Sequence, residues 1–532
     1  MEGDTISKRN FFLKAHLLCK KSVQGLSQIM KQKERNKPMT INIYNTLTRR
    51  KETFEPLREG KIGMYVCGIT AYDRCHIGHA RSAVVFDVIV RFLRKVGYDV
   101  TFVRNFTDID DKIINRAKEE GIGTEELAQR EIGHFYEDMD ALGVKRADVE
   151  PRATEHIPDI VALIERLIQR GYAYESQGDV YFAVRRFPDY GKLSRRDLEQ
   201  LMAGARIMPG EKKKDPLDFA LWKAAKPGEP SWESPWGRGR PGWHIECSAM
   251  SMKYLGETFD IHGGGLDLAF PHHENEIAQS EAATGKQFVK YWVHNGFVTI
   301  KGEKMSKSLG NFITIKDILE TFHPEAVRLF LLSKHYRSPL DYSPESLKEA
   351  TAALDRCYNA LHEAAEIISM PVKKQRPLPE HVNESAAFIH ALDEKVTSSM
   401  SDDFNTAKAL GYLFDAVRNL NRIIECARNK PSALYKDVLA ECVNIVMEVS
   451  NVFGILREEP EKYLQERNLK ALEASGLTLS ELDRLIDERN KARKEKDFKR
   501  ADEIRDELSK KGIFLKDTPS GTKWSAEIQK GA

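Results

Sequence analysis

The chain has 532 residues, of which 41% are hydrophobic and 30% charged, a composition typical of a globular protein with more than one domain. No apolar run approaches the about 20 residues of a membrane-spanning helix, so we expect no membrane partner. The 82 basic residues nearly balance the 80 acidic ones, and a polyanion would have to meet a local basic patch. Seven cysteines are few for this length and favour free or metal-bound thiols over a disulfide framework.

Residues 1–38 differ in composition from the remainder. The stretch KRNFFLKAHLLCKK is basic, but Lys14 interrupts its apolar part and no small-residue cleavage site follows, which argues against a secretory signal. Glu2 and Asp4 count against an organellar transit peptide. We expect a basic, disordered extension ahead of Met39 and a cytoplasmic protein, with organellar targeting as the alternative.

An α/β pattern begins after this extension. KIGMYVCG predicts a short strand, apolar residues recur at helical spacing from HIGHARS onward, and DVTFVRNFTDID predicts a second strand. The result is a βαβ unit whose first loop meets a helix N-terminus, where backbone N–H groups and the helix dipole attract phosphate. An insertion of helices and turns follows, then the α/β pattern resumes, and the chain after Ser343 is almost wholly helical.

Two histidines three residues apart, His76 and His79, open the predicted helix with Gly78 between them. Their imidazoles can share one face and donate to phosphate oxygens that the helix dipole already favours. Taken alone, such a pair more often consists of capping or surface histidines.

Two distant motifs change this interpretation. In KMSKS, Lys304 and Lys307 lie in a glycine-bounded loop and could neutralise the charge of a leaving pyrophosphate. In HGGGLD, the glycines, among them Gly265, would let the backbone approach a nucleotide, and Asp267 could accept from a ribose hydroxyl.

HIGH together with KMSKS resembles the signature pair of the class I aminoacyl-tRNA synthetases. Within this class, the stretches YVCGITAYDRCHIGHARS, NFTDIDDKI, GWHIECSAM, FPHHENEIAQSEA and SDDFNTAKAL are similar to those of the cysteinyl-tRNA synthetases, and the likeness runs from about Thr40 to Trp524. It implies an α/β fold: a Rossmann-type class I synthetase catalytic domain with an insertion, followed by an α-helical bundle and a small C-terminal domain.

The resemblance and the pattern together predict five segments. They are the extension 1–38, the catalytic domain 39–300 with its insertion at about 121–235, a stem-contact region 301–342 carrying KMSKS, a helical bundle 343–470, and an anticodon-recognition region 471–532.

The resemblance also implies one zinc ion per subunit, held by Cys67, Cys247, His272 and Glu276. The local chemistry agrees, because His272 and Glu276 are four residues apart and would share one side of a helix, and two thiolates, an imidazole and a carboxylate suit tetrahedral zinc. Small buried hydrophobes are the commoner fate of isolated cysteines. Neighbouring Cys75 and His273 are assigned to packing or to the ATP side rather than to the metal.

The reaction implied by the resemblance is a two-step ligation of L-cysteine to cysteine tRNA, with ATP and Mg²⁺. Charge stabilisation on the phosphates would fall to His76, His79, Lys304 and Lys307. The nucleotide would be held by His76, Gly78, His79, Gly265, Asp267, Lys304 and Lys307. Thr107, Trp243 and His262 match positions of the amino-acid pocket, where zinc would select a thiolate over a serine hydroxyl.

The C-terminal region carries an excess of basic residues between Arg489 and Lys516, followed by Trp524. A basic surface with an aromatic side chain suits an unpaired anticodon base, although a solvated helix with i,i+4 pairs fits the charges equally well. Two rivals share parts of this pattern. A ligase that couples cysteine to an amino sugar would lack the helical region after Ser343, and a non-enzymatic RNA-binding relative would lack phosphate or zinc residues. We expect a monomer.

Overall fold

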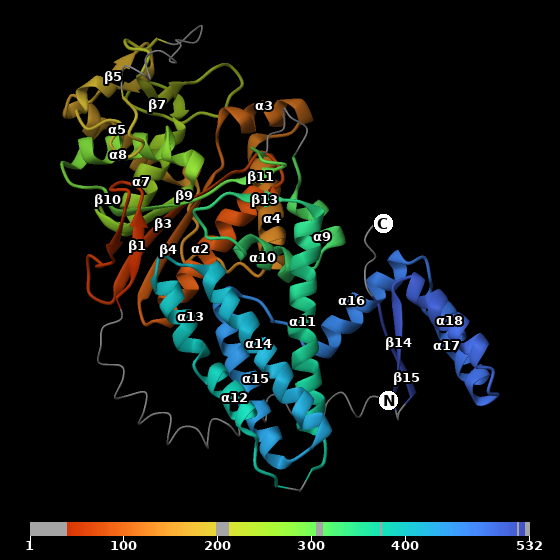
Figure 1. Cartoon of the computed structure of the whole chain (residues 1–532). Helices are drawn as coiled ribbons and strands as arrows, with labels where there is room; N and C mark the ends of the chain where they lie inside the picture. Colours follow the sequence, from red (N-terminus) through yellow and green to blue (C-terminus); the bar gives the residue numbers. More distant parts are fainter. Residues whose placement is uncertain (1–39, 198–211, 305–311, 373–374, 519–520, 527–532) are drawn as a thin grey trace. The chain divides into compact units, whose positions relative to one another are not determined.

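The computed structural model describes residues 40–197, 212–304, 312–372, 375–518 and 521–526, with only the backbone at Lys304 and Thr518 (Figure 1). The chain divides into two compact units. The first comprises Met1–Ala352, Ala387–Ala416 and Asn444–Ile455, and the second comprises Ala353–Ala386, Val417–Val443 and Leu456–Ala532. None of the described helices is long and apolar enough to cross a membrane.

A parallel four-stranded sheet lies at the centre of the first unit (Figure 1). Its strands are, in spatial order, β10 (Val289–Asn295), β9 (Phe259–Gly265), β3 (Lys61–Thr70) and β4 (Asp99–Thr107). β9 and β10 are buried almost throughout, as expected for parallel strands covered on both faces.

The sheet is covered by helices on both faces. Two successive residues of β9 show this: a Cβ at Gly263 would lie 2.3 Å from the Phe86 ring of α2 (Ile77–Lys95), and one at Gly264 would lie 3.0 Å from His273 of α8 (His272–Thr284). Successive strand residues point to opposite faces, so α2 and α8 pack on opposite sides. The first two glycines of HGGGLD are therefore needed for internal packing.

The segment between β4 and α7, which contains the predicted insertion at about 121–235, is built from helices and a second sheet. Its helices are α3 (Asp111–Glu120), α4 (Thr124–Ala141) and α5 (Ile157–Gln169), with the short η1 (Ala153–His156) and η2 (Val184–Arg186). Its antiparallel strands are β5 (Ala173–Ser176), β6 (Asp179–Phe182), β7 (Phe219–Ala224) and β8 (Gly239–Pro241). The expectation of helices and turns alone was thus wrong for this sheet. Its strands have only three to six residues, and although β5 and β6 form a tight hairpin, β6 also depends on pairing with the distant β7.

A buried ion pair joins α2 to α10 (Pro324–Leu332). Arg328 is fully buried and pairs with Asp87, to which Arg91 also donates at 2.8 Å. Burial alone would raise the pKa of Asp87, but Arg328 and Arg91 hold it below its usual value. Arg328 also donates to the carbonyl of Leu142 at 3.2 Å, so one side chain connects three helices of the first unit.

The other elements of the catalytic part are short. They are β1 (Asn42–Asn45), β2 (Arg50–Thr53), α7 (Trp243–Leu255), η3 (Leu266–Ala269), β11 (Val298–Ile300), β12 (Glu303–Lys304), α9 (Ile315–Thr321) and β13 (Leu340–Tyr342).

The chain beyond β13 is helical, as the sequence predicts, and ends in a strand pair (Figure 1). The helices are α11 (Pro344–Ser369), α12 (Glu380–His390), α13 (Leu392–Ser401), α14 (Thr406–Asn429), α15 (Ala433–Phe453), α16 (Pro460–Ala474), α17 (Leu479–Lys494) and α18 (Phe498–Lys510). β14 (Ile513–Thr518) and β15 (Gly521–Ala526) pair antiparallel. The last helices and this hairpin share a small apolar core of their own within the second unit.

Candidate active site

The candidate site lies where the order of the central sheet reverses. The chain leaves β3 through α2 to reach β4 on one side, and leaves β9 through α8 to reach β10 on the other. β3 and β9 are neighbours, with Tyr65 opposite His262 and Val66 opposite Gly263. In an open parallel sheet, such a switch point leaves a crevice at the carboxyl ends of the strands, where ligands bind.

An irregularity in β3 places Cys67 at this crevice. The register between β3 and β4 shifts between Val66 and Ile69, so Cys67 and Gly68 lie in a bulge. Gly68 donates its N–H to the side-chain oxygen of Asn105 at 2.9 Å, and a Cβ at Gly68 would lie 1.6 Å from the Asn105 carbonyl oxygen. Only glycine fits there, and bulges of this kind redirect the neighbouring side chain.

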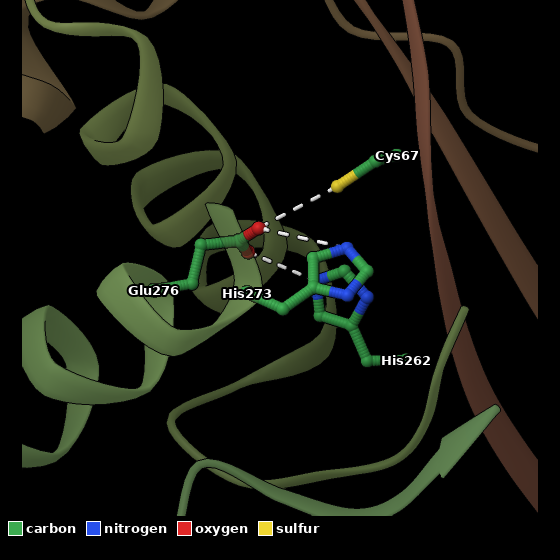
Figure 2. A group of neighbouring side chains, drawn as sticks. All are labelled: Cys67, His262, His273 and Glu276. Atoms are coloured by element: carbon green, nitrogen blue, oxygen red, sulfur yellow. Dashed lines mark hydrogen bonds and ion pairs between the residues drawn. The ribbon is translucent and has the colours of Figure 1, made fainter. Parts of the chain in front are cut away.

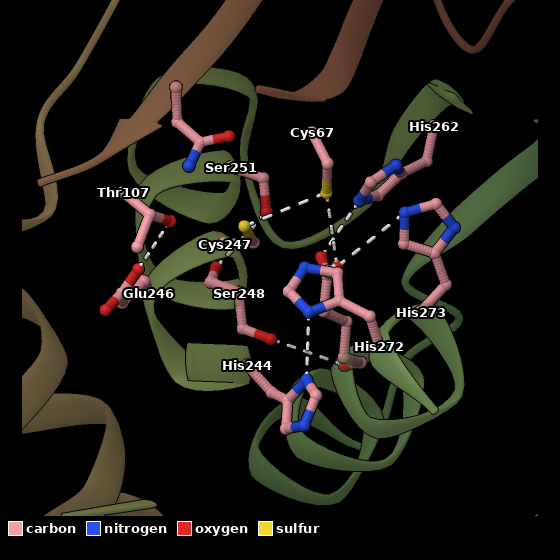
Figure 3. Close-up of polar contacts among 12 residues, drawn as sticks. Cys67, Thr107, His244, Glu246, Cys247, Ser248, Ser251, His262, His272 and His273 are labelled. Carbon is pink, nitrogen blue, oxygen red and sulfur yellow. Dashed lines mark hydrogen bonds and ion pairs between the residues drawn. The ribbon is translucent and has the colours of Figure 1, made fainter. Parts of the chain in front are cut away.

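Two helices bring three further donors to Cys67. Cys247 is on the first turns of α7, and His272 begins α8 (Figure 3). Glu276 follows His272 one turn later on α8. Cys67 Sγ lies 3.7 Å from Cys247 Sγ and 3.5 Å from Glu276 Oε1, and His272 Nε2 lies 3.0 Å from the same oxygen. One donor atom from each residue lies within 4.8 Å of all the others. The four residues implied by the resemblance thus meet at one point.

A second group of four donors shares Cys67 and Glu276 with the first. It replaces Cys247 and His272 by His262 and His273 (Figure 2). His262 Nε2 lies 2.9 Å from Glu276 Oε2, whereas His273 Nε2 lies 4.0 Å from Oε1. The two oxygens of Glu276 therefore have different partners: Oε2 faces His262, and Oε1 faces Cys67 and His272. This division favours the group with two thiols as the metal set.

The electrostatics of the first group also suit a cation. The hydrogen bond from Cys67 lowers the pKa of Cys247 to about 6 even though burial opposes ionisation. Burial likewise opposes the charged forms of Glu276 and His272, but His262 and His272 lower the pKa of Glu276 to about 2, and Glu276 and Cys247 raise that of His272 to about 10. Burial raises the pKa of Cys67, so without a metal Cys67 and His272 each hold a proton, which zinc would displace to gain two thiolates, an imidazole and a carboxylate as ligands.

Two histidines that the sequence analysis did not single out extend this cluster. His244 Nδ1 lies 2.9 Å from His272 Nδ1, on the side of the ring away from Glu276 (Figure 3). His294 Nε2 lies 2.8 Å from His273 Nδ1. His244 adjoins Trp243 in GWHIEC, but His294 lies on β10 and no local pattern marks it.

The HIGH histidines cap the start of α2. His76 is the N-cap, and its Nδ1 accepts from the Gly78 N–H at 3.0 Å; His79 Nδ1 accepts from the His76 N–H at 3.3 Å. Their rings stack with centroids 3.7 Å apart. Because each Nδ1 accepts, the proton of each neutral imidazole is on Nε2, the tautomer that can donate to an anion. Burial, followed by the charge of His76, lowers the pKa of His79 well below its usual value. The two histidines can therefore cap α2 through Nδ1 and donate to a phosphate through Nε2–H at the same time.

The chain after KMSKS returns to this helix start. Lys304 ends β12, and its side chain and all of Lys307 lie outside the described residues. The Phe312 ring meets His76 edge-on at 5.2 Å, and Ile77 N–H donates to the Ile313 carbonyl at 3.3 Å. The segment that begins at Phe312, a few residues after KMSKS in the sequence, is thus held against the HIGH turn.

The other predicted pocket residues surround the same crevice. Trp243 begins α7 with its ring centroid 4.4 Å from that of His272, and it is 37% exposed. Thr107 ends β4 and is buried. Gly265 ends β9 and Asp267 follows on η3, beyond the strand end. Cys75 is buried, and burial raises its pKa.

Trp524 is less accessible than the sequence suggested. It lies on β15 opposite Leu515 and packs against the apolar core of the last helices. Arg489 forms two 2.9 Å hydrogen bonds to Asp517, so part of the basic excess is already paired with carboxylates. The role of Trp524 in binding tRNA stays a prediction.

Comparison with known proteins gives the class first. The profile of the tRNA synthetases class I (C) catalytic domain matches residues 53–352, and a DALR domain profile matches 395–457. The structure resembles Mycobacterium tuberculosis methionyl-tRNA synthetase in complex with methionyl-adenylate, with a TM-score of 0.57 at 17% identity over 79% of this chain and 94% of that one. The fold and the profiles define a class I aminoacyl-tRNA synthetase.

The family within this class follows from closer relatives. The profile of the cysteinyl-tRNA ligase anticodon binding domain matches residues 479–524. Cysteine–tRNA ligases of Syntrophotalea carbinolica and Maridesulfovibrio salexigens are each 57% identical over 92% and 91% of this chain, and that of Geobacter sulfurreducens is 54% identical over 92%. All three relatives are covered over their full length. The chain belongs to the cysteine–tRNA ligase family.

Proposed function

We propose that this chain activates L-cysteine with ATP and transfers it to the 3′ end of cysteine tRNA. In the first step the carboxylate of cysteine attacks the α-phosphorus of ATP, which forms cysteinyl-adenylate and releases pyrophosphate. In the second step a terminal ribose hydroxyl attacks the acyl carbon, which forms the ester and releases AMP. The observation that carries the proposal is the meeting of Cys67, Cys247, His272 and Glu276 at the switch point of the sheet.

The same donor set supports zinc as the resident metal. When bound, the ion would take the substrate thiolate as a ligand and lower the pKa of the thiol, whereas a serine hydroxyl is a poor ligand. Cys67, Cys247 and His272 Nε2 would hold the ion with Glu276 Oε1. His244 would accept the Nδ1 proton of His272, and His262 would hold the other oxygen of Glu276.

We assign binding of the ATP phosphates to the start of α2, at the end of the β3–α2 connection opposite to Cys67. His76 and His79 would donate Nε2–H to the phosphate oxygens at the positive end of α2, and Lys304 and Lys307 would neutralise the pyrophosphate as it leaves. Mg²⁺ would arrive with ATP. Positioning and charge stabilisation suffice for this chemistry, so no covalent enzyme intermediate is needed.

The helical region after Ser343 favours the tRNA ligase over a ligase acting on an amino sugar. We assign anticodon recognition to residues 471–532, and we infer a cytoplasmic monomer. The five predicted segments and their boundaries remain part of this proposal.

ATP–pyrophosphate exchange across a panel of amino acids tests the activation step. We expect exchange with cysteine and almost none with serine, because the pocket is built around a bond that serine cannot make. Charging of purified cysteine tRNA then tests the second step. Comparable exchange with saturating serine would refute zinc-based selection, and exchange without charging would refute the tRNA as acceptor.

A further inference from the structure

A fully buried arginine, Arg81, lies on the second turn of α2, two residues after the HIGH turn. Its guanidinium donates to four backbone carbonyls, those of Phe297, His335, Tyr336 and Ser338. The two terminal nitrogens have different partners: Nη1 lies 2.7 Å from the Phe297 oxygen, whereas Nη2 holds the other three oxygens, with that of Tyr336 at 3.2 Å. Burial lowers the pKa of Arg81 to about 10, so the side chain is charged at neutral pH.

Arg81 differs from other buried arginines in forming no ion pair with a carboxylate of the described residues. Arg328 pairs with Asp87, and Arg104 pairs with Glu150 at 2.6 Å. A buried charge without a counterion is unfavourable, and an apolar side chain would fill the same space without losing hydration. What the charge provides is the attachment of four carbonyl groups, so the role of Arg81 depends on the segments to which they belong.

The four carbonyls belong to two segments that run side by side. One joins β10 to β11, and the other is the loop of residues 335–338 before β13. Gly296 N–H donates to the Tyr336 carbonyl at 2.8 Å, and a Cβ at Gly296 would lie 2.6 Å from the Ser338 carbonyl oxygen, so only glycine fits there. β11 and β13 begin directly beyond these contacts and pair in parallel (Figure 1). Arg81 thus fixes the start of both strands against α2.

The two strands place the first residue of KMSKS. β11 pairs antiparallel with β12, which ends at Lys304. Asp341 of β13 accepts from the Thr299 hydroxyl at 2.7 Å and from the Gly302 N–H at 2.9 Å, so the β11–β12 hairpin is attached to β13 as well. The backbone of Lys304 is therefore held by the same two strands that Arg81 anchors.

The chain after KMSKS is attached to the same part of α2. Ile77 N–H donates to the Ile313 carbonyl at 3.3 Å, and Ile315 N–H donates to the Cys75 carbonyl at 3.0 Å. These contacts use the backbone around the HIGH turn, whereas before KMSKS the attachment is through the side chain of Arg81. The start of α2 thus holds the chain on both sides of KMSKS.

We propose that Arg81 is a positioning residue for adenylate formation, which holds β11 and β13 so that Lys304 lies at the correct distance from the HIGH histidines. This inference rests on the proposed function, which places the ATP phosphates between HIGH and KMSKS. Arg81 acts through the two strands and does not touch the substrate. The fork of the guanidinium is required, because Nη1 and Nη2 each hold a different segment, and a lysine ammonium has the charge but only one nitrogen.

Three variants separate this role from general support of the fold. Arg81→Met removes the charge and the donors, and Arg81→Lys removes only the fork. Arg94→Met is the matched control, because Arg94 lies on the last turn of the same helix and donates to the Val100 carbonyl at 2.9 Å. For each protein we would measure kcat and the KM for cysteine in pyrophosphate exchange, zinc content, and the rate of transfer to tRNA from isolated enzyme-bound cysteinyl-adenylate. Amide hydrogen exchange of residues 296–304 and 335–342 reports on the two strands without reference to activity.

We expect kcat of pyrophosphate exchange to fall about 100-fold in Arg81→Met and about 10-fold in Arg81→Lys, since a misplacement of about 1 Å is enough for such a loss. The KM for cysteine, zinc content and the transfer rate should be unchanged, because pyrophosphate has left before transfer. Amide hydrogen exchange should become faster in both segments. Arg94→Met should retain the wild-type values.

Equal slowing of adenylate formation and transfer, or loss of zinc, would show that Arg81 supports the whole site and would overturn the proposal. Wild-type exchange kinetics in Arg81→Lys would also overturn it, and this variant decides the question if Arg81→Met does not fold. A loss of kcat in Arg94→Met as large as that in Arg81→Met would show a general effect on α2 and count against the proposal as well. Failure of the wild type to catalyse cysteine-dependent exchange would refute the proposed function instead, while amide hydrogen exchange would still decide whether Arg81 anchors the two strands.

Discussion

Replacement of Glu276 by glutamine should weaken zinc binding without abolishing it. Two thiolates and one carboxylate contribute three negative charges against the two positive charges of Zn²⁺, so a substrate thiolate would join a site that is already negative by one. Glu276 is the hardest donor, and its Oε2 already has His262 as a partner at 2.9 Å. It can therefore leave the metal without becoming an unpaired buried charge.

The magnitude follows from what the Gln side chain retains. Its single carbonyl oxygen can face either the metal or His262, but not both, and its charge is lost. We expect zinc affinity to fall about 10- to 100-fold, or about 1.4 to 2.7 kcal/mol, as for other changes in ligand support. Cys247→Ser should lose zinc far more completely, since a neutral hydroxyl replaces a soft thiolate 3.7 Å from Cys67.

The assay is zinc content after competition with a chromophoric chelator, with cysteine affinity measured on the same samples. Glu257→Gln is the control, because it removes a carboxylate of α7's flanking turn that pairs with Arg166 and Lys286 rather than with the cluster. Cysteine should bind the Glu276→Gln protein at least as tightly as wild type, since repulsion between anions is reduced. If that variant loses zinc as completely as Cys247→Ser, Glu276 is an indispensable ligand and the reasoning fails.

Three other changes address separate parts of the molecule. His79→Ala and Lys307→Ala should each slow adenylate formation in pyrophosphate exchange while zinc content stays unchanged; loss of zinc in either would show a misassigned site. Deletion of residues 477–532 should spare exchange but sharply reduce tRNA charging in a salt-sensitive way, and undiminished charging would contradict anticodon recognition there. Asp87→Asn should lower the free energy of unfolding at pH 7 by about 3 to 5 kcal/mol, because the buried Arg328 loses its opposite charge. The folded state lowers the pKa of Asp87, so this contribution exists above its unfolded value and is lost as the pH falls through the folded one; a difference that stays constant as the pH is lowered below the unfolded pKa of Asp87 would argue against the ion pair.

The truncation begins at residue 477 and not at the predicted boundary of 471, because α16 continues past that residue. The sequence suggested a domain beginning at residue 471, but α16 runs through Ala474, and Ala471 and Leu472 belong to the apolar core of the last helices. A cut at 471 would split a helix. A cut after Gly476, which has a positive φ of 75°, follows the end of the helix and leaves α16 intact.

Local sequence patterns predicted those structural features that are determined by residues close together in the chain. The strand–loop–helix unit around HIGH was readable because apolar spacing and the three-residue interval between His76 and His79 are set within one segment. The contact of Cys67 with Glu276 joins residues 209 positions apart and depends on the order of the strands. No spacing rule yields that contact, and only the family resemblance brought the four donors together in advance.

The features that were missed share one physical cause. His244 faces the ring of His272, and His294 faces the ring of His273, and only these contacts mark the two residues as part of the cluster. The bulge at Gly68 is likewise a consequence of how closely β4 approaches β3 at Asn105. Each depends on a partner from another part of the chain, so it is determined by packing and not by propensity.

The β3–α2 connection carries both ends of the proposed reaction. Cys67 lies in the bulge at one end and His76 caps the helix at the other, nine residues later. The connection between them is held by hydrogen bonds to separate elements, from Ala71 N–H to the Thr107 carbonyl and from Ile77 N–H to the Ile313 carbonyl. The distance from the thiol end to the phosphate end is therefore fixed by backbone packing, whereas the preference for a thiol is set by the chemistry of the donors. This one segment thus sets the distance between the thiol and the phosphate subsites through its backbone packing. It contributes to the choice of side chain separately, through the donor atom of Cys67.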